Sequence, residues 1–183
     1  EEHKQFVEQT VAANKDCKWR IVTLHQDIYG SAEHSNEPEI TNLRYQLAPI
    51  FEDNKVDVVL TGHDHAYSRT QILKGGHKTT EYANADFKSM LNKDMDAGTN
   101  PDGVYTAHEN IKADTTDPSE KAYLDYLNHV MDKDAIQQVT KKGTTVFNPT
   151  GILYMTAGSS SGSKYYDLVP RQQSYISNRW QQD

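Results

Sequence analysis

The stretch VDVVLTGHDHAYSR (residues 56–69) joins an apolar run to a glycine and two histidines, His63 and His65. A short run rich in β-branched residues and bounded by glycine predicts a strand buried in a sheet. Both histidines follow the end of this strand. In parallel α/β sheets, ligands bind beyond the carboxyl ends of the strands. The stretch therefore predicts a strand and a candidate site directly after it.

The residues upstream predict a partner for this strand. WRIVTL (residues 19–24) is nearly continuous apolar, which favours a strand covered on both faces, and it ends at His25. Between the two strands lies a helical stripe, in which Pro49 predicts a kink or an early break. Its apolar members are Ile40, Leu43, Leu47, Ile50 and Phe51. Strand–helix–strand units are usually parallel, so His25 and His63 should reach the same edge of the sheet.

Further elements are expected on both sides of this unit. Residues 2–14 have the spacing of a short amphipathic helix, and AYSRTQIL (residues 66–73) and GILYMTAG (residues 151–158) predict two more strands. Residues 76–145 are polar and rich in turn signals, which indicates an insertion within a single domain over residues 1–183. One helix is expected in it, capped by Ser119. Residues 174–183 give no closing signal.

Composition narrows the function classes. The net charge of −7 argues against nucleic acid or an anionic membrane as the main partner. The lone Cys17 excludes an internal disulfide framework and a thiolate-rich zinc module. No apolar run has the length of a membrane span. The first residues resemble the middle of a helix rather than a signal peptide, so we expect a piece of a larger protein.

The histidines are candidate metal ligands. In an extended segment His63 and His65 would face the same way with Asp64 turned aside, and Gly62 would allow a sharp turn. An isolated H-x-H also occurs in many surface loops. His25 at a neighbouring strand end strengthens the case for ligation, and both interpretations stay open on the residues alone. His34 lies in a loop that should leave the same edge. The other histidines, His3, His77, His108 and His129, are expected on the surface.

These residues resemble the calcineurin-like metallophosphoesterases, within them the branch of the purple acid phosphatases. The family motif G-H-x-H-x-Y-x-R is matched by Gly62, His63, His65, Tyr67 and Arg69. The motif V-x-x-H-x-P-x-Y is matched by His25 and Tyr29, but Asp27 stands where the family usually has proline. The late segment YMTAGSSSGS completes the resemblance.

The resemblance implies an α/β fold that is the C-terminal half of a four-layer αββα sandwich. It implies a two-metal site of Fe, Mn or Zn, with His25 and His63 on one ion and His65 on the other. His34 falls where purple acid phosphatases place a histidine that contacts the substrate phosphate or assists the leaving group, and Tyr67 is a candidate substrate contact. The implied substrate is a phosphoester, and a secreted or cell-envelope location is favoured.

The family's upstream motifs are missing from these residues. The motifs G-D-x-x-Y and G-N-H-[DE] do not occur, and two ions need a bridging anion that three neutral histidines do not supply. We therefore expect a fragment with little or no activity of its own and weak binding of metal. Two alternatives remain open at this point. One is a non-catalytic binding domain, and the other is a mononuclear zinc hydrolase built on the three histidines.

Two smaller features have open interpretations. The loop SSSGSK (residues 159–164) would cradle an anion through its backbone N–H groups or would be a plain turn. Tyr165 and Tyr166 are expected to pack on the sheet rather than stack on a ligand.

Overall fold

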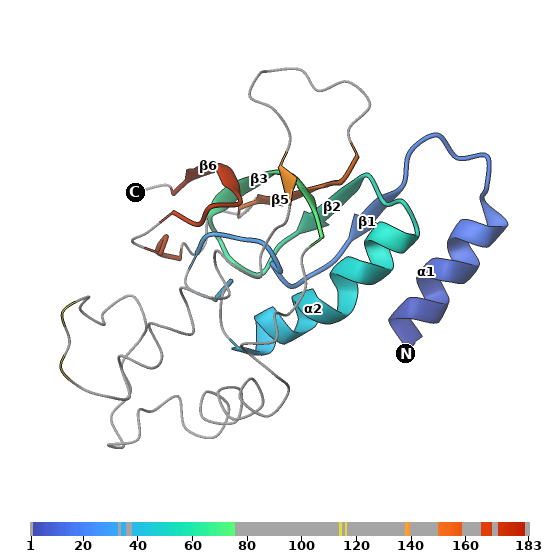
Figure 1. Ribbon diagram of the computed structural model, residues 1–183. Helices are drawn as coiled ribbons and strands as arrows, with labels where there is room; N and C mark the ends of the chain where they lie inside the picture. The colour runs from blue at the N-terminus through green and yellow to red at the C-terminus, as the bar shows by residue number, and fades with distance from the viewer. Residues whose placement is uncertain are drawn as a thin grey trace.

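The computed structural model describes residues 2–32, 34–35, 38–75, 114, 116, 138–139, 150–158, 166–169 and 172–181. Two helices and a sheet make up this part of the chain (Figure 1). The helices are α1 (Glu2–Ala13) and α2 (Pro38–Asp53). The strands are β1 (Ile21–Thr23), β2 (Val58–Thr61), β3 (Tyr67–Lys74), β4 (Gln138–Val139), β5 (Ile152–Ala157) and β6 (Ile176–Trp180).

The six strands form one mixed sheet in the order β1-β2-β5-β3-β4, and β6 pairs with β3 off this path. The parallel part consists of β1, β2 and β5, with Val22 opposite Val59 and Val59 opposite Tyr154. β3 runs antiparallel to β5 and to β6. The predicted parallel strand–helix–strand unit and the strands at residues 66–73 and 151–158 are confirmed.

Helix α2 provides much of the core. Its residues Leu47, Ala48 and Phe51 are buried in one cluster with Val59 and Tyr154 of the sheet. The break expected at Pro49 is wrong, because the helix continues to Asp53. Pro49 is exposed, and the buried residues on both sides of it hold the last turn against the sheet.

Strand β1 is less covered than predicted. Ile21 is 62% exposed and Trp19 is 63% exposed, so the expectation of a strand buried on both faces is wrong. The physical reason is that Trp19 and Ile21 line an open groove beside α1, at the edge of the described sheet, where no described residue covers them fully.

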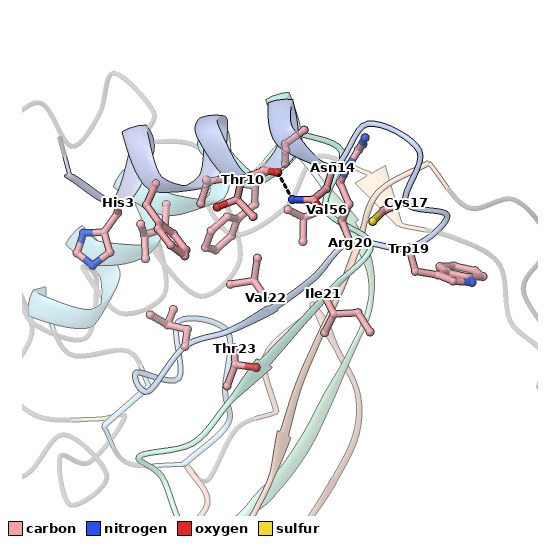
Figure 2. A pocket seen from close by; sticks show the side chains of 16 residues that line it. His3, Thr10, Asn14, Cys17, Trp19, Arg20, Ile21, Val22, Thr23 and Val56 are labelled. Atoms are coloured by element: carbon pink, nitrogen blue, oxygen red, sulfur yellow. Dashed lines mark hydrogen bonds between the residues drawn. The ribbon is translucent and has the colours of Figure 1, made fainter.

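Helix α1 confirms the helix expected at residues 2–14, but its apolar side is open. None of its residues is buried, and Phe6 is 70% exposed. Between α1, β1 and α2 lies a groove of about 420 Å³ with apolar walls, shown in Figure 2 with Val22 on its sheet side. No described helix is long and apolar enough to cross a membrane.

The C-terminal segment forms a strand that the sequence analysis missed. β6 pairs antiparallel with the first half of β3, with Ser68 opposite Arg179. Within residues 76–145, Gln138 and Val139 form β4 against Leu73 and Lys74. The helix expected after Ser119 and the loop at residues 159–164 lie outside the described residues.

Candidate functional site

Two histidines meet at the carboxyl ends of the parallel strands. The pairing of β1 with β2 continues past both strands, because Leu24 donates its N–H to Leu60 O at 2.9 Å and Gly62 donates to His25 O at 3.0 Å. The ring centroids of His25 and His63 are therefore only 5.4 Å apart. The structure therefore brings the rings of His25 and His63 together, as predicted from the parallel strands.

The segment around His63 is a tight turn rather than an extended strand. Asp64 donates its N–H to Gly62 O at 2.8 Å, and His63 between them has φ of 66°. This hydrogen bond closes a three-residue γ-turn, in which a positive φ at the central residue is strained. The sharp turn thus falls on His63 and not on Gly62. The premise that His63 and His65 face one way in an extended chain is wrong.

His34 joins the first pair of histidines from a different loop. Its ring lies edge-on to His63, with centroids 5.4 Å apart. The loop that carries it is held from α2 by Arg44, whose side chain is fully buried and donates to Ile28 O and, at 3.2 Å, to Ser35 O. The ring of His34 therefore lies beside that of His63, a predicted metal ligand.

His65 is linked to this group through an aromatic residue. Tyr166 contacts the ring of His34 and the ring of His65, each at a centroid distance of 5.0 Å. Tyr166 thus packs on two site histidines, which the sequence analysis did not foresee. Tyr165 lies outside the described residues.

Residues 173–175 of the C-terminal segment form hydrogen bonds with the loop between β1 and α2. Tyr175 donates its hydroxyl to Gly30 O at 3.0 Å, and the Gln173 amide donates to the same oxygen at 3.2 Å. The hydroxyl of Ser31 donates to the side-chain oxygen Oε1 of Gln173 at 2.7 Å. These contacts span more than 140 residues of sequence, so no local pattern would have revealed them.

Asp27, at the position where the family usually has proline, is buried beside Thr61 of β2 and Thr156 of β5. It is only 4% exposed, and Thr61 donates to its carboxylate at 3.1 Å. Burial raises the pKa of Asp27 to about 7, against the hydrogen bonds of Thr156 and Thr61 and with the charge of Asp64 adding to the rise. Asp27 is thus a buried carboxyl group that is hydrogen-bonded inside the protein.

The side chain of Asp64 is buried as well. It is 1% exposed and accepts a hydrogen bond from Ser35 Oγ at 2.7 Å. Its second oxygen, Oδ1, lies 3.4 Å from Nδ1 of His63. Both carboxylates near the histidines are therefore engaged inside the protein.

The histidines fit part of a metal site. Two imidazoles bound tetrahedrally to one ion have ring centres about 5 Å apart, given metal–nitrogen distances of about 2.1 Å. The separation of His25 and His63 matches this value. Among the described residues, however, no group of three or more His, Cys, Asp or Glu side chains has the geometry to hold a metal ion. Within the described part of the chain, the candidate ligands are imidazoles, and no carboxylate joins them in such a group.

The other residues singled out from the sequence are Tyr67 and the remaining histidines. Tyr67 is half-buried at the start of β3, opposite Ala157 and Trp180, and within the described part of the chain it has no ring contact with the histidines. His3 is exposed on α1, as expected, whereas His77, His108 and His129 lie outside the described residues.

The chain is similar to known proteins over part of its length. Residues 1–67 match the family model of the calcineurin-like phosphoesterases. Purple acid phosphatase 4 of Arabidopsis thaliana is 46% identical over 49 residues, 27% of this chain and 14% of that protein. Purple acid phosphatase 19 of the same plant is 33% identical over 95 residues, 51% and 23% of the two chains.

An uncharacterized protein of Mycobacterium tuberculosis is 30% identical over 77 residues, which are 40% of this chain and 14% of that protein. The matched part thus spans between 14% and 23% of the length of these relatives. The strand ends with His25 and His63 lie within the matched residues 1–67. The similarity to the calcineurin-like phosphoesterases thus covers residues 1–67, and the chain resembles purple acid phosphatases over a part of its length.

Proposed function

We propose that this chain supplies the histidine side of the metal centre of a metal-dependent phosphoester hydrolase, a phosphatase or a phosphodiesterase. The observation that carries the proposal is the meeting of His25, His63 and His34, which come from two parallel strand ends and the loop after β1. The complete domain is proposed to be the four-layer αββα sandwich of the family, with the present sheet as its C-terminal half.

In this proposal His25 and His63 hold one ion. Their centroid distance of 5.4 Å supports this pairing. His65 is proposed to bind a second ion, as the family resemblance implies. Bound metal ions would supply a hydroxide nucleophile and neutralise charge on the phosphoryl oxygens. Fe, Mn and Zn are all compatible with imidazole ligands.

His34 is proposed to bind the substrate phosphate and to hold a proton for the departing alkoxide. Its edge-on contact with His63 supports this role, because it places the imidazole next to a proposed ligand. Tyr67 is proposed as a second substrate contact. Asp27 and Asp64 accept hydrogen bonds from Thr61 and Ser35, and the anionic ligands of a dinuclear site are proposed to come from other residues.

The metal proposal is tested by calorimetric titration of the 183-residue chain with zinc or manganese. We expect weak binding of one equivalent, and a loss of affinity of about tenfold or more in His25→Ala and in His63→Ala. His3→Ala is the matched control, because His3 is exposed on α1 and should leave binding unchanged. Equal affinities in all four proteins would overturn the assignment.

A turnover assay separates the proposal from its alternatives. With an aryl phosphate and manganese or iron, we expect little or no hydrolysis by this chain, since its described residues form no cluster of three metal-binding groups. Robust turnover would refute the proposal that this chain supplies only the histidine side of the metal centre. Absence of any metal binding would favour a non-catalytic binding domain instead.

A further inference from the structure

Tyr166 lies between two histidines of the candidate site. Its ring is edge-on to that of His34, at an interplanar angle of 88°, and tilted by 40° against that of His65, and both centroid distances are 5.0 Å. Aromatic rings attract one another at centroid distances of about 4.5–7 Å, and edge-on geometry is among the preferred ones. One half-buried side chain therefore contacts both the proposed substrate-binding imidazole and a proposed metal ligand.

The backbone places Tyr166 opposite His34. Ala32 and Leu168 form an antiparallel bridge between the loop after β1 and the segment 166–169. In an antiparallel register each step forward from Ala32 matches a step back from Leu168, so His34 falls opposite Tyr166. Directly opposed residues of an antiparallel pair carry their side chains on the same face. The contact between the two rings thus follows from the pairing of two segments that are far apart in the sequence.

The segment that carries Tyr166 is also held near the start of β3, where His65 lies. The side-chain amide of Gln181 donates to the carboxylate of Asp167 at 2.9 Å. Gln181 directly follows β6, which pairs with Tyr67 at the start of β3. His65 precedes Tyr67 by two residues in the chain. The segment 166–169 is therefore fastened on one side to the loop of His34 and on the other to the sheet beside His65.

The two contacts concern a spacing on which the proposed chemistry depends. Reacting groups must be held in a near-attack geometry, and a small displacement loses much of the rate. In the proposed function His34 binds the phosphate and His65 binds an ion, so the placement of one imidazole relative to the other matters. A tyrosine side chain has few rotatable bonds, and its ring is therefore a rigid spacer.

We propose that Tyr166 is a positioning residue whose ring fixes the placement of His65 relative to His34, and thereby the distance between the second ion and the substrate phosphate. The statement about the ion and the phosphate rests on the proposed function. The statement about the two imidazoles does not, because it concerns this chain without any metal.

The first test is NMR of the metal-free chain. The ring signals of the two histidines are assigned by their loss in His34→Gln and in His65→Gln. We expect nuclear Overhauser contacts from the ring of Tyr166 to the ring protons of both histidines. These protons should shift in Tyr166→Leu and stay close to their wild-type positions in Tyr166→Phe, which keeps the ring. Absence of either contact in the wild type would overturn the proposal, and this result needs no variant to fold.

The second test uses Mn²⁺ as a paramagnetic probe of the same chain. A bound Mn²⁺ ion broadens the signals of nearby protons, and the effect falls steeply with distance. We expect the ring protons of His34, His63 and His65 to broaden. In Tyr166→Leu the broadening of His65 should fall relative to that of His63, because a ring without this contact samples orientations away from the ion. Tyr166→Phe should keep the wild-type ratio.

The ratio separates positioning from a merely structural role. It does not depend on how much metal is bound, so a loss of stability or affinity alone leaves it unchanged. Phe6→Leu is the matched control, because it removes an exposed aromatic ring from α1 and should keep the wild-type ratio. An unchanged ratio in Tyr166→Leu would overturn the positioning role. If Mn²⁺ broadens none of the histidines although both contacts of Tyr166 are present, the proposed function fails and the placement of the two imidazoles stands.

Discussion

Gly30 stands where the loop after β1 has no room for a side chain. A Cβ atom at this position would lie 1.8 Å from Oδ2 of Asp27 and 2.3 Å from Oγ of Ser35. The main chain carbonyl of Gly30 also accepts from Tyr175 and Gln173. Because Gly30 has no side chain, the carboxyl group of Asp27 and the C-terminal residues Tyr175 and Gln173 can all pack against it.

We expect Gly30→Ala to destabilise the protein by about 3 kcal/mol or more, because an added methyl group in a close-packed interior forces its neighbours apart. Urea unfolding measures the effect. Gly62→Ala is the matched control, since a Cβ there would meet its nearest atom, His25 O, at 3.6 Å, an ordinary contact. Similar stabilities of the two variants would contradict the close packing of Asp27 and Ser35 against Gly30.

At the scale of elements, α2 connects the two site strands and holds the loop after β1 through Arg44. The guanidinium of Arg44 lies 4.6 Å from the ring centroid of Tyr29 and 5.5 Å from that of Tyr175. The buried guanidinium of Arg44 therefore joins α2 to the loop that carries Tyr29 and to the C-terminal segment that carries Tyr175. The helix is continuous through Pro49, although proline has no N–H to donate to the carbonyl group four residues earlier.

Pro49→Ala should stabilise the protein by about 1–3 kcal/mol, because proline is far less favourable than alanine inside a helix. The free energy of unfolding in urea is the measurement. Gln46→Ala, an exposed change on the same helix, should shift this free energy by no more than about 0.5 kcal/mol. An unchanged or lower stability of Pro49→Ala would show that the proline shapes the helix end.

The elements also mark the limit of sequence-based prediction. Apolar periodicity located α1, α2 and four of the strands, since each of these segments has its own local pattern. It did not locate β6, where exposed Ser177 and Asn178 and half-buried Arg179 follow buried Ile176. A strand at the edge of a sheet lacks the alternation of a half-buried one, and β6 is placed by its pairing with β3.

For the whole molecule, the buried carboxyl group of Asp27 links stability to pH. Its pKa of about 7 in the folded state lies above the value of 3.8 for an ordinary aspartate, chiefly because of burial. Between these two values the folded state keeps a proton that the unfolded state has lost. Stability should therefore fall as the pH rises through this window, and it should level off above the folded-state pKa.

Between pH 5 and pH 8 this effect should lower the free energy of unfolding by on the order of 3 kcal/mol. Asp27→Asn removes the titrating group and keeps its shape, so the variant should gain stability relative to the wild type as the pH rises. Urea unfolding at several pH values, with a chelator present, measures the difference. Parallel curves for the two proteins would contradict the buried position of Asp27.

The sequence by itself determined the strand–helix–strand unit and the meeting of His25 with His63. Periodicity reports which face of a segment is buried, and parallel pairing then brings consecutive strand ends to one edge. Only the tertiary structure decided the turn at His63, the contact of Tyr166 with two histidines, and the exposure of β1. These features depend on packing between residues far apart in the chain, and no local pattern encodes such packing.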